Sequence, residues 1–260
     1  MEHQSPPPLR IRALGALCIE SPAGPLHLRA ARIRKPLELL QALIAAGANG
    51  VGQHHLCEAL WRDSEGDAAY RSLITTVYRL RRWLHCCDAV TFVAGRVALS
   101  AQHCWIDVWA FEQALECHGS GRDTRESLSL YGGPLLPGCE LPLVLDKREQ
   151  LRRKYLRSVL RALRQLEQSG LRQAAIELAE RAVEAEPASE ELHRELIALL
   201  GREGQAAAAS GAYRRCRAAL LRNFGTRPSP ATERALLDAR NFHAASGALL
   251  FTAATGPLAV

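Results

Sequence analysis

Five basic or polar side chains between residues 68 and 84 have a spacing that would place them on one face of a helix. On a wheel of about 100° per residue they lie together, opposite an apolar stripe. They are Arg71, Thr75, Tyr78, Arg79 and Arg82. Guanidinium groups bind guanine edges and phosphates, threonine offers a methyl or hydroxyl group, and tyrosine reaches the sugar–phosphate backbone. This face therefore predicts contact with the major groove of double-stranded DNA.

The opposite face of the same segment predicts how such a helix would be held. Leu73, Val77, Leu80 and Leu84 have the spacing of a buried helical stripe. For an isolated helix, an ordinary solvated basic face would be the simpler interpretation. The elements that flank this helix favour contact with DNA instead.

Strand, helix and hairpin signals surround the basic helix in a specific order. Residues 9–17 and 26–28 have strand patterns, and Pro36 opens a helix that ends at Gly47. A short helix over residues 56–61 and an acidic loop over residues 63–67 come next, and residues 90–99 have the pattern of a hairpin around Gly95. This order is typical of a winged helix-turn-helix. Arg96 is the charged residue of the wing hairpin and is expected to meet phosphate.

Beyond residue 104 the pattern is helical and contains an internal repeat. A shift of 34 residues maps Leu166 to Leu200, Gly170 to Gly204 and Arg181 to Arg215. This period is typical of tetratricopeptide repeats. The predicted fold class is mainly α, with a winged helix-turn-helix domain over residues 9–103 and an all-α tetratricopeptide-like domain over 104–243. Residues 244–260 are expected to form a flexible tail, because Gly247 and Gly256 interrupt an apolar stretch.

Composition and motifs exclude several other classes. The net charge of +6 is concentrated at the N-terminal side, where residues 1–103 carry 12 Lys and Arg against 8 Asp and Glu. The sequence shows no phosphate-binding loop, no nucleophile elbow and no paired carboxylates, so neither an enzyme nor a cofactor is expected. The eight cysteines lack the paired spacing of a zinc site, which predicts no metal. The lack of a signal peptide or a long apolar run predicts a cytoplasmic protein without a membrane span.

Three groups of residues resemble a known family of regulators. The segments 34–40, 56–61 and 73–82 are similar to the OmpR-type winged helix of SARP/AfsR-like activators. Residues 106–111, 131–138, 212–217 and 224–230 are similar to the bacterial transcriptional activator domain that comes after it in that family. The resemblance covers roughly residues 9–240. The wing departs from the family, because Arg96-Val97-Ala98-Leu99 stands where Gly-Tyr-Arg-Leu is usual.

The resemblance carries expectations about partners and about individual residues. It implies a regulator that binds direct-repeat DNA sites side by side, with self-association on such sites, and that contacts RNA polymerase through a sigma factor or another subunit. It favours Arg79 and Arg81 as groove contacts. The helical wheel instead favours Arg82 over Arg81 as a contact residue. All three are kept as predicted DNA contacts.

The acidic loop has two interpretations. Asp63 and Glu65 would repel phosphate, so together with the resemblance they predict a polymerase contact. The alternative is a solvated turn in which Asp67 stabilises the start of the next helix.

The function predicted from the sequence is a sequence-specific DNA-binding transcription regulator, an activator that recruits RNA polymerase and acts in the cytoplasm at the nucleoid. The alternative is a helical-repeat interaction scaffold whose winged helix no longer binds DNA.

Overall fold

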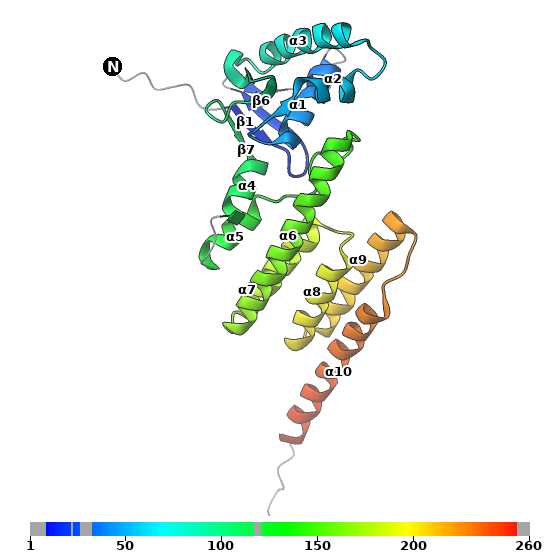
Figure 1. Cartoon of the computed structure of the whole chain (residues 1–260). Helices are drawn as coiled ribbons and strands as arrows, with labels where there is room; N and C mark the ends of the chain where they lie inside the picture. The colour runs from blue at the N-terminus through cyan, green and yellow to red at the C-terminus, as the bar shows by residue number, and fades with distance from the viewer. Residues whose placement is uncertain (1–8, 22, 27–32, 117–120, 254–260) are drawn as a thin grey trace, which may run out of the picture. The chain divides into compact units, whose positions relative to one another are not determined.

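The computed structural model of the chain describes residues 9–21, 23–26, 33–116 and 121–253. Its contacts divide the chain into two compact units, residues 1–155 and residues 156–260. The division falls inside one long helix, α6 (Pro142–Gln168). Over the residues that the structure describes, the chain is mainly helical and carries two small sheets, both in the first unit (Figure 1).

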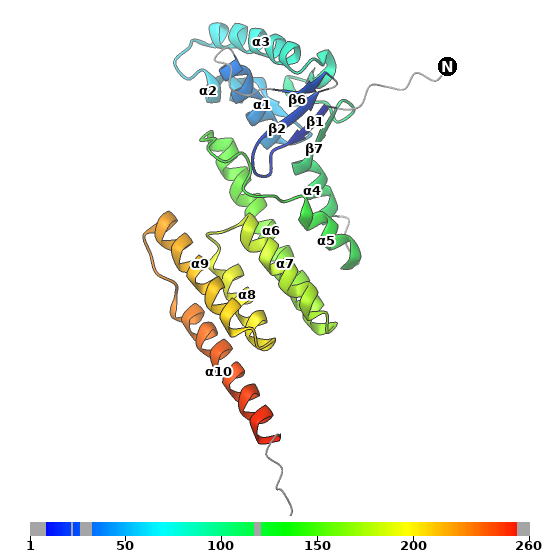
Figure 2. The same ribbon diagram turned by 180° about the vertical axis from the view of Figure 1, so that it is seen from behind.

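The first sheet has four strands in the order β3-β2-β1-β7. These are β1 (Leu9–Arg12), β2 (Cys18–Ser21), β3 (Gly24–Pro25) and β7 (Cys104–Ile106). β1 alternates buried Leu9 and Ile11 with exposed Arg10 and Arg12, the period-2 pattern of a strand that has one covered face. β7 pairs with β1 in parallel, so segments far apart in sequence lie side by side (Figure 2).

Three helices form the core of the winged helix-turn-helix. They are α1 (Arg34–Ala46), α2 (Gln53–Leu60) and α3 (Gly66–Trp83). α3 lies against both α1 and α2 (Figure 1). The first turn of α1 contains Pro36, where a missing N–H costs nothing. Leu39, Leu43, Leu56 and Leu73 are fully or almost fully buried between these helices.

The predicted hairpin is present and belongs to a second sheet. β5 (Val90–Val93) and β6 (Arg96–Leu99) are antiparallel, and the two-residue strand β4 (Val51–Gly52) pairs with β6. A short 3-10 helix, Cys87–Ala89, links α3 to β5. The expected order of strands, helices and wing is therefore confirmed, with β4 and β7 as strands that the sequence pattern did not predict.

The first unit continues past the wing through α4 (Asp107–Glu116) and α5 (Gly121–Ser129). The connector after α5 returns to the first sheet, because the Leu136 N–H donates to the Ala13 carbonyl at 2.9 Å and Leu14 forms a bridge with Leu135. The Arg148 guanidinium holds this connector by donating to the carbonyls of Leu135, Leu136 and Cys139 at 2.6, 2.6 and 2.9 Å. These bonds fasten the start of α6 to the winged helix.

The second unit contains antiparallel helices of the tetratricopeptide kind. After α6 come α7 (Arg172–Ala185), α8 (Glu190–Arg202), α9 (Ala206–Phe224) and α10 (Pro230–Ala253). Gly170 and Gly204, one repeat apart, both adopt a positive φ, 71° and 69°, at the turn before α7 and α9. A Cβ at Gly201 would lie 2.6 Å from the Cβ of Ala239, so α8 and α10 pack closely there. The predicted tetratricopeptide-like fold is confirmed.

The flexibility expected for the segment from residue 244 stays a prediction, and the structure describes its first part, up to Ala253, as the end of α10. Its alanine and leucine content favours helix, and the glycine at position 247 costs only about 1 kcal/mol against it. Residues 254–260 lie outside the described residues. Near the strand expected at residues 26–28 the structure has β3 at Gly24–Pro25. Leu26 is not part of a strand, and residues 27 and 28 lie outside the described residues.

The domain limits proposed from the sequence, 103/104 and 243/244, stay predictions. The contacts nevertheless place residues 104–155 in one compact unit with the winged helix.

Candidate nucleic-acid interface

The orientation of α3 depends on its buried stripe. Leu73, Val77 and Leu80 are at most 2% exposed, and Leu84 just after the helix is fully buried. Burying four such side chains anchors the helix, since each contributes on the order of 1.5–3 kcal/mol. The opposite face of α3 is therefore held toward solvent.

That outward face carries the predicted contact residues. Arg71, Thr75, Tyr78, Arg79 and Arg82 are all exposed, and Tyr78 is 64% exposed. Asp67 in the first turn is the acidic residue of α3, and the helix carries no Asp or Glu after it. The face is thus basic over its length, which is the electrostatic requirement for an approach to phosphate.

Arg81 differs from the other predicted contacts on α3. It is half-buried, and its Nε and Nη2 atoms donate to the Val90 carbonyl at 3.1 and 2.5 Å. Its guanidinium also lies 6.0 Å from the centre of the Phe92 ring. Within the described structure, this arginine connects the end of α3 to strand β5 of the wing.

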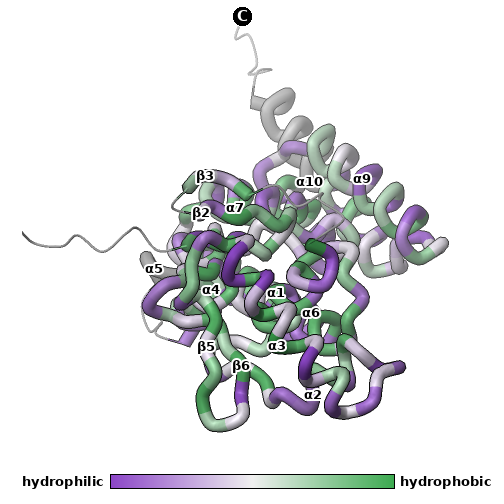
Figure 3. The backbone as a smooth tube through the Cα atoms, turned by 90° about the horizontal axis from the view of Figure 1, so that it is seen from above, coloured by the Kyte–Doolittle hydropathy of each residue, from purple (hydrophilic) through white to green (hydrophobic). Residues whose placement is uncertain are grey.

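The wing turn is short and apolar. Ala94 and Gly95 have φ values of 49° and 73°, as in a two-residue hairpin turn, and Val93 before them is 67% exposed. Figure 3 shows the β5–β6 hairpin, whose turn is pale and thus close to neutral in hydropathy. The wing therefore offers few polar groups of its own to a nucleic acid.

Arg96, at the base of that turn, is bound to the loop between α1 and α2. Its Nε donates to the Asn49 carbonyl at 2.9 Å, and its Nη2 donates to the Gly50 carbonyl at 2.7 Å. Gly50 has a φ of 62°, and a Cβ there would lie 2.3 Å from the Val97 carbonyl oxygen. Glycine is required at this position because the loop and β6 approach so closely. Arg96 remains exposed.

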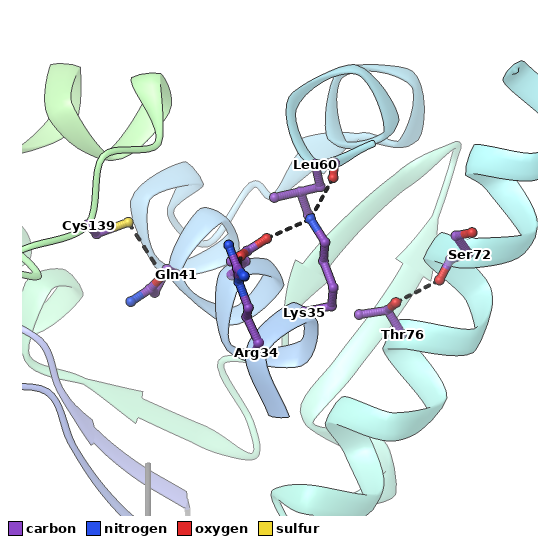
Figure 4. A network of polar contacts seen from close by, with 8 residues as sticks. Arg34, Lys35, Gln41, Leu60, Ser72, Thr76 and Cys139 are labelled. Atoms are coloured by element: carbon purple, nitrogen blue, oxygen red, sulfur yellow. Dashed lines mark hydrogen bonds and ion pairs between the residues drawn. The ribbon is translucent and has the colours of Figure 1, made fainter. Parts of the chain in front are cut away.

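A lysine positions the segment that precedes the acidic loop. Lys35 Nζ, at the start of α1, donates to the Leu60 carbonyl at the end of α2 and to Glu38 Oε2, both at 2.8 Å (Figure 4). It also lies 5.7 Å from the centre of the Trp61 ring. A cation at the carboxyl end of α2 is stabilised by the helix dipole. The chain leaves α2 in a defined direction toward Asp63 and Glu65.

The acidic loop is solvent-exposed. Asp63, Ser64 and Glu65 are all exposed, and α3 begins directly after Glu65. Glu65 occupies the N-cap position, yet its side chain makes no capping hydrogen bond. Asp63 and Glu65 thus stand together at the amino end of α3, while the predicted groove contacts lie along its length.

Two exposed residues of α3 were not among the sequence-based candidates. Ile74 is 41% exposed and Tyr70 is 46% exposed. Ile74 lies four residues before Tyr78, and Tyr70 lies four residues before Ile74. Residues spaced by four are neighbours on a helix, so all three lie along one edge of the outward face. The four-residue spacing is the signal in the sequence that could have found them.

A buried carboxylate fastens the first sheet to the start of α4. Asp107, 3% exposed, accepts hydrogen bonds from the N–H groups of Ala13, Leu14 and Val108 at 2.8–3.0 Å. Burial raises the pKa of Asp107, and the hydrogen bonds from these N–H groups oppose that shift. This residue belongs to the Ile106-Asp107 motif, and its environment indicates a structural role.

Neither a metal cluster nor a membrane-spanning helix is found within the described ranges. No three His, Cys, Asp or Glu side chains there gather closely enough to hold an ion. None of the described helices combines the length and apolar character needed to cross a bilayer.

Cys104, Cys139 and Cys216 are buried thiols, and burial raises the pKa of Cys216 to about 11, which makes it unreactive at neutral pH.

A winged helix-turn-helix joined to tetratricopeptide-like helices defines a class of bacterial regulators, and comparison with known proteins supports this assignment. Residues 107–237 match the bacterial transcriptional activator domain (BTAD). The match covers half of the chain, and the chain belongs to this family of transcriptional regulators. It confirms the resemblance to SARP/AfsR-like regulators that the sequence predicts.

The fold is also similar to a solved structure. Mycobacterium tuberculosis EmbR, in complex with a low-affinity phosphopeptide, superposes with a TM-score of 0.57 at 20% sequence identity. The alignment covers 93% of this chain and 70% of that chain. At this identity the comparison establishes a shared fold. No curated protein sequence matches the chain significantly.

Proposed function

We propose that the chain binds specific sequences in double-stranded DNA and activates transcription by recruiting RNA polymerase. The observation that carries the proposal is the outward face of α3. Its basic residues are exposed, the helix has no acidic residue after Asp67, and a fully buried leucine stripe holds it in one orientation. A helix of this kind, between a short helix and a wing, suits insertion into the major groove.

The proposed contacts differ in the information they supply. Arg71, Arg79 and Arg82 are exposed enough to bind guanine edges or phosphates, and Tyr78 can reach the backbone. Arg81 is half-buried and bonded to strand β5, so it would act by positioning the wing. Arg96 is bonded to the loop before α2 but is exposed, so it can still contact phosphate. Family membership further supports binding to direct-repeat sites by neighbouring copies, and action at the nucleoid in the cytoplasm.

The polymerase contact is assigned to Asp63 and Glu65. Both are exposed, and neither makes an ion pair among the described residues. Their charge would repel phosphate, so a basic surface on a sigma factor or another polymerase subunit is the fitting partner. Membership in a transcriptional activator family supports this choice.

A salt-dependent gel shift tests DNA binding directly. Duplexes recovered from a random-sequence library by the purified chain serve as probes, with scrambled duplexes of equal length as competitors. Specific binding should weaken steeply with salt, with a slope near −0.9 for each phosphate neutralised. A chain that enriches no sequence and shows no salt dependence would contradict the proposal.

The alternative, a protein-binding scaffold, has one observation in its favour. Tyr70, Ile74 and Tyr78 expose apolar surface on α3, as a protein-docking helix would. The same gel shift separates the two, because a scaffold would leave every duplex unbound.

A further inference from the structure

Apolar carbon is exposed along one edge of the basic face of α3. Ile74 is 41% exposed and lies between Arg71 and Tyr78 in sequence, on the same outward side of the helix. Transfer of such a side chain from water to an apolar contact is favourable. Because Ile74 is not buried in the protein core, its burial against a binding partner would stabilise the complex.

The neighbouring threonine carries a methyl group and a hydroxyl group, and its hydroxyl already donates within the helix. Thr75 Oγ1 donates to the Arg71 carbonyl one turn earlier in α3, at 2.9 Å, while the residue remains exposed. The hydroxyl proton is therefore used inside the helix. Its Cγ2 methyl group remains for contact, directly beside Ile74 in sequence.

The major groove contains one aliphatic group, the 5-methyl group of thymine. Arginine side chains donate hydrogen bonds to the acceptor atoms of guanine. The Ile74 side chain and the Thr75 methyl group cannot form hydrogen bonds with any base. A face that combines both kinds of side chain would select a site containing guanine and thymine. The protein's own geometry thus indicates which base the apolar part of the face would contact.

We propose that Ile74, together with the methyl group of Thr75, determines sequence specificity by packing against thymine 5-methyl groups. This inference rests on the proposed DNA-binding function and adds the base that the apolar residues recognise. The partners are double-stranded DNA sites that carry thymine where the central part of α3 enters the groove.

Replacement of thymine by deoxyuridine tests the inference, because it removes the methyl group and keeps every hydrogen-bonding atom. The probe is the duplex recovered from the random library, with each thymine replaced singly. For the wild-type chain, at least one replacement should weaken binding about fourfold, the equivalent of one buried methyl group. Ile74→Ala should bind the thymine duplex more weakly and lose the sensitivity to that replacement.

Two further variants sharpen the comparison. Thr75→Ser deletes the methyl group and keeps the hydroxyl that bonds to Arg71, so it should reduce the same sensitivity without changing helix stability. Leu237→Ala, on α10 and 56% exposed, removes an exposed apolar side chain elsewhere and should leave the sensitivity unchanged. Denaturant unfolding confirms that each variant is folded.

The outcomes distinguish the inference from the proposed function. If the wild-type chain recovers a sequence but no deoxyuridine replacement affects binding, the inference is wrong and DNA binding stands. The inference is equally wrong if Ile74→Ala and Thr75→Ser retain the full wild-type sensitivity. If no sequence is recovered, the proposed function is itself wrong, and the exposed strip on α3 belongs to a protein contact.

Discussion

The guanidinium group of Arg81 joins the C-terminal turn of α3 to the first residue of β5. Its Nε and Nη2 atoms donate to the Val90 carbonyl at 3.1 and 2.5 Å. One side chain thereby couples the position of the proposed recognition helix to the position of the wing. Arg82, the next residue, is exposed and makes no such bond among the described residues.

Arg81→Ala should lower the free energy of unfolding by about 1–2 kcal/mol, because a half-buried carbonyl loses charge-assisted hydrogen bonds. Arg82→Ala, the matched control, should change it by no more than about 0.5 kcal/mol. Urea unfolding followed by circular dichroism measures both. Equal stability of the two variants would show that the Arg81 bond contributes nothing.

Arg79→Ala should weaken specific DNA binding by about 1–3 kcal/mol, the range for a lost bidentate base contact. Arg79 is exposed on α3, so the fold should be unaffected. Titration of the selected duplex by fluorescence anisotropy gives the dissociation constant. Arg181→Ala, an exposed arginine of α7, controls for the loss of one positive charge. Unchanged affinity in Arg79→Ala would remove this residue from the interface.

Arg96→Ala should weaken binding to all duplexes alike and reduce the magnitude of the salt slope by about one unit. The reason is that Arg96 is exposed beside the wing turn, so its charge would meet a phosphate while its Nε and Nη2 atoms stay bonded to the carbonyls of Asn49 and Gly50. Loss of these bonds should also loosen the loop before α2. Affinities for specific and scrambled duplexes, measured over a range of salt, check this. A loss confined to the specific duplex would instead show base-selective contact by the wing.

The double variant Asp63→Ser and Glu65→Ser should reduce activated transcription while DNA binding is retained. Serine is favoured at the N-cap position that Glu65 occupies, and Asp67 remains in the first turn, so α3 should stay stable. In vitro transcription from a promoter carrying the selected site measures activation. Glu20→Ser, which removes an exposed acid on β2, is the control. Full activation by the double variant would mean that the loop is a solvated turn.

The contribution of Glu112 to the free energy of unfolding should depend on pH. Burial favours its neutral form, but hydrogen bonds from Lys147 and Lys154, at 2.7 and 2.6 Å, lower the pKa of Glu112 below 4.5 overall. A lowered pKa in the folded state means that the contribution is complete above pH 4.5 and is lost as the pH falls through the folded-state pKa.

Glu112→Gln should therefore cost about 1–3 kcal/mol at neutral pH. It should also flatten the dependence of stability on pH below about 4.5. Urea unfolding from about pH 3 to about pH 7, a range that spans the titration of a carboxylate, tests both effects. An unchanged slope in acid would show that the two lysines do not hold this carboxylate.

The sequence determined the features that depend on neighbouring residues. The three- and four-residue apolar spacing of Leu73, Val77 and Leu80 requires a helix with one buried face, and the structure confirms it. The 34-residue period placed Gly170 and Gly204 at equivalent turns. Periodicity of side chains is a local property, so it can be seen in the sequence before any contact is known.

Only the tertiary structure decided which predicted contacts are available to a partner. Arg79, Arg81 and Arg82 are chemically alike in sequence, yet Arg81 is bonded to a carbonyl that lies on another element. Arg96 is likewise bonded to a loop 46 residues earlier in the chain, at Gly50. The parallel pairing of β1 with β7 and the hydrogen bonds from Ala13 and Leu14 to Asp107 also join segments far apart in sequence. Such contacts exist only once the chain has packed, because hydrogen-bond partners are chosen by distance in space and not by separation along the sequence.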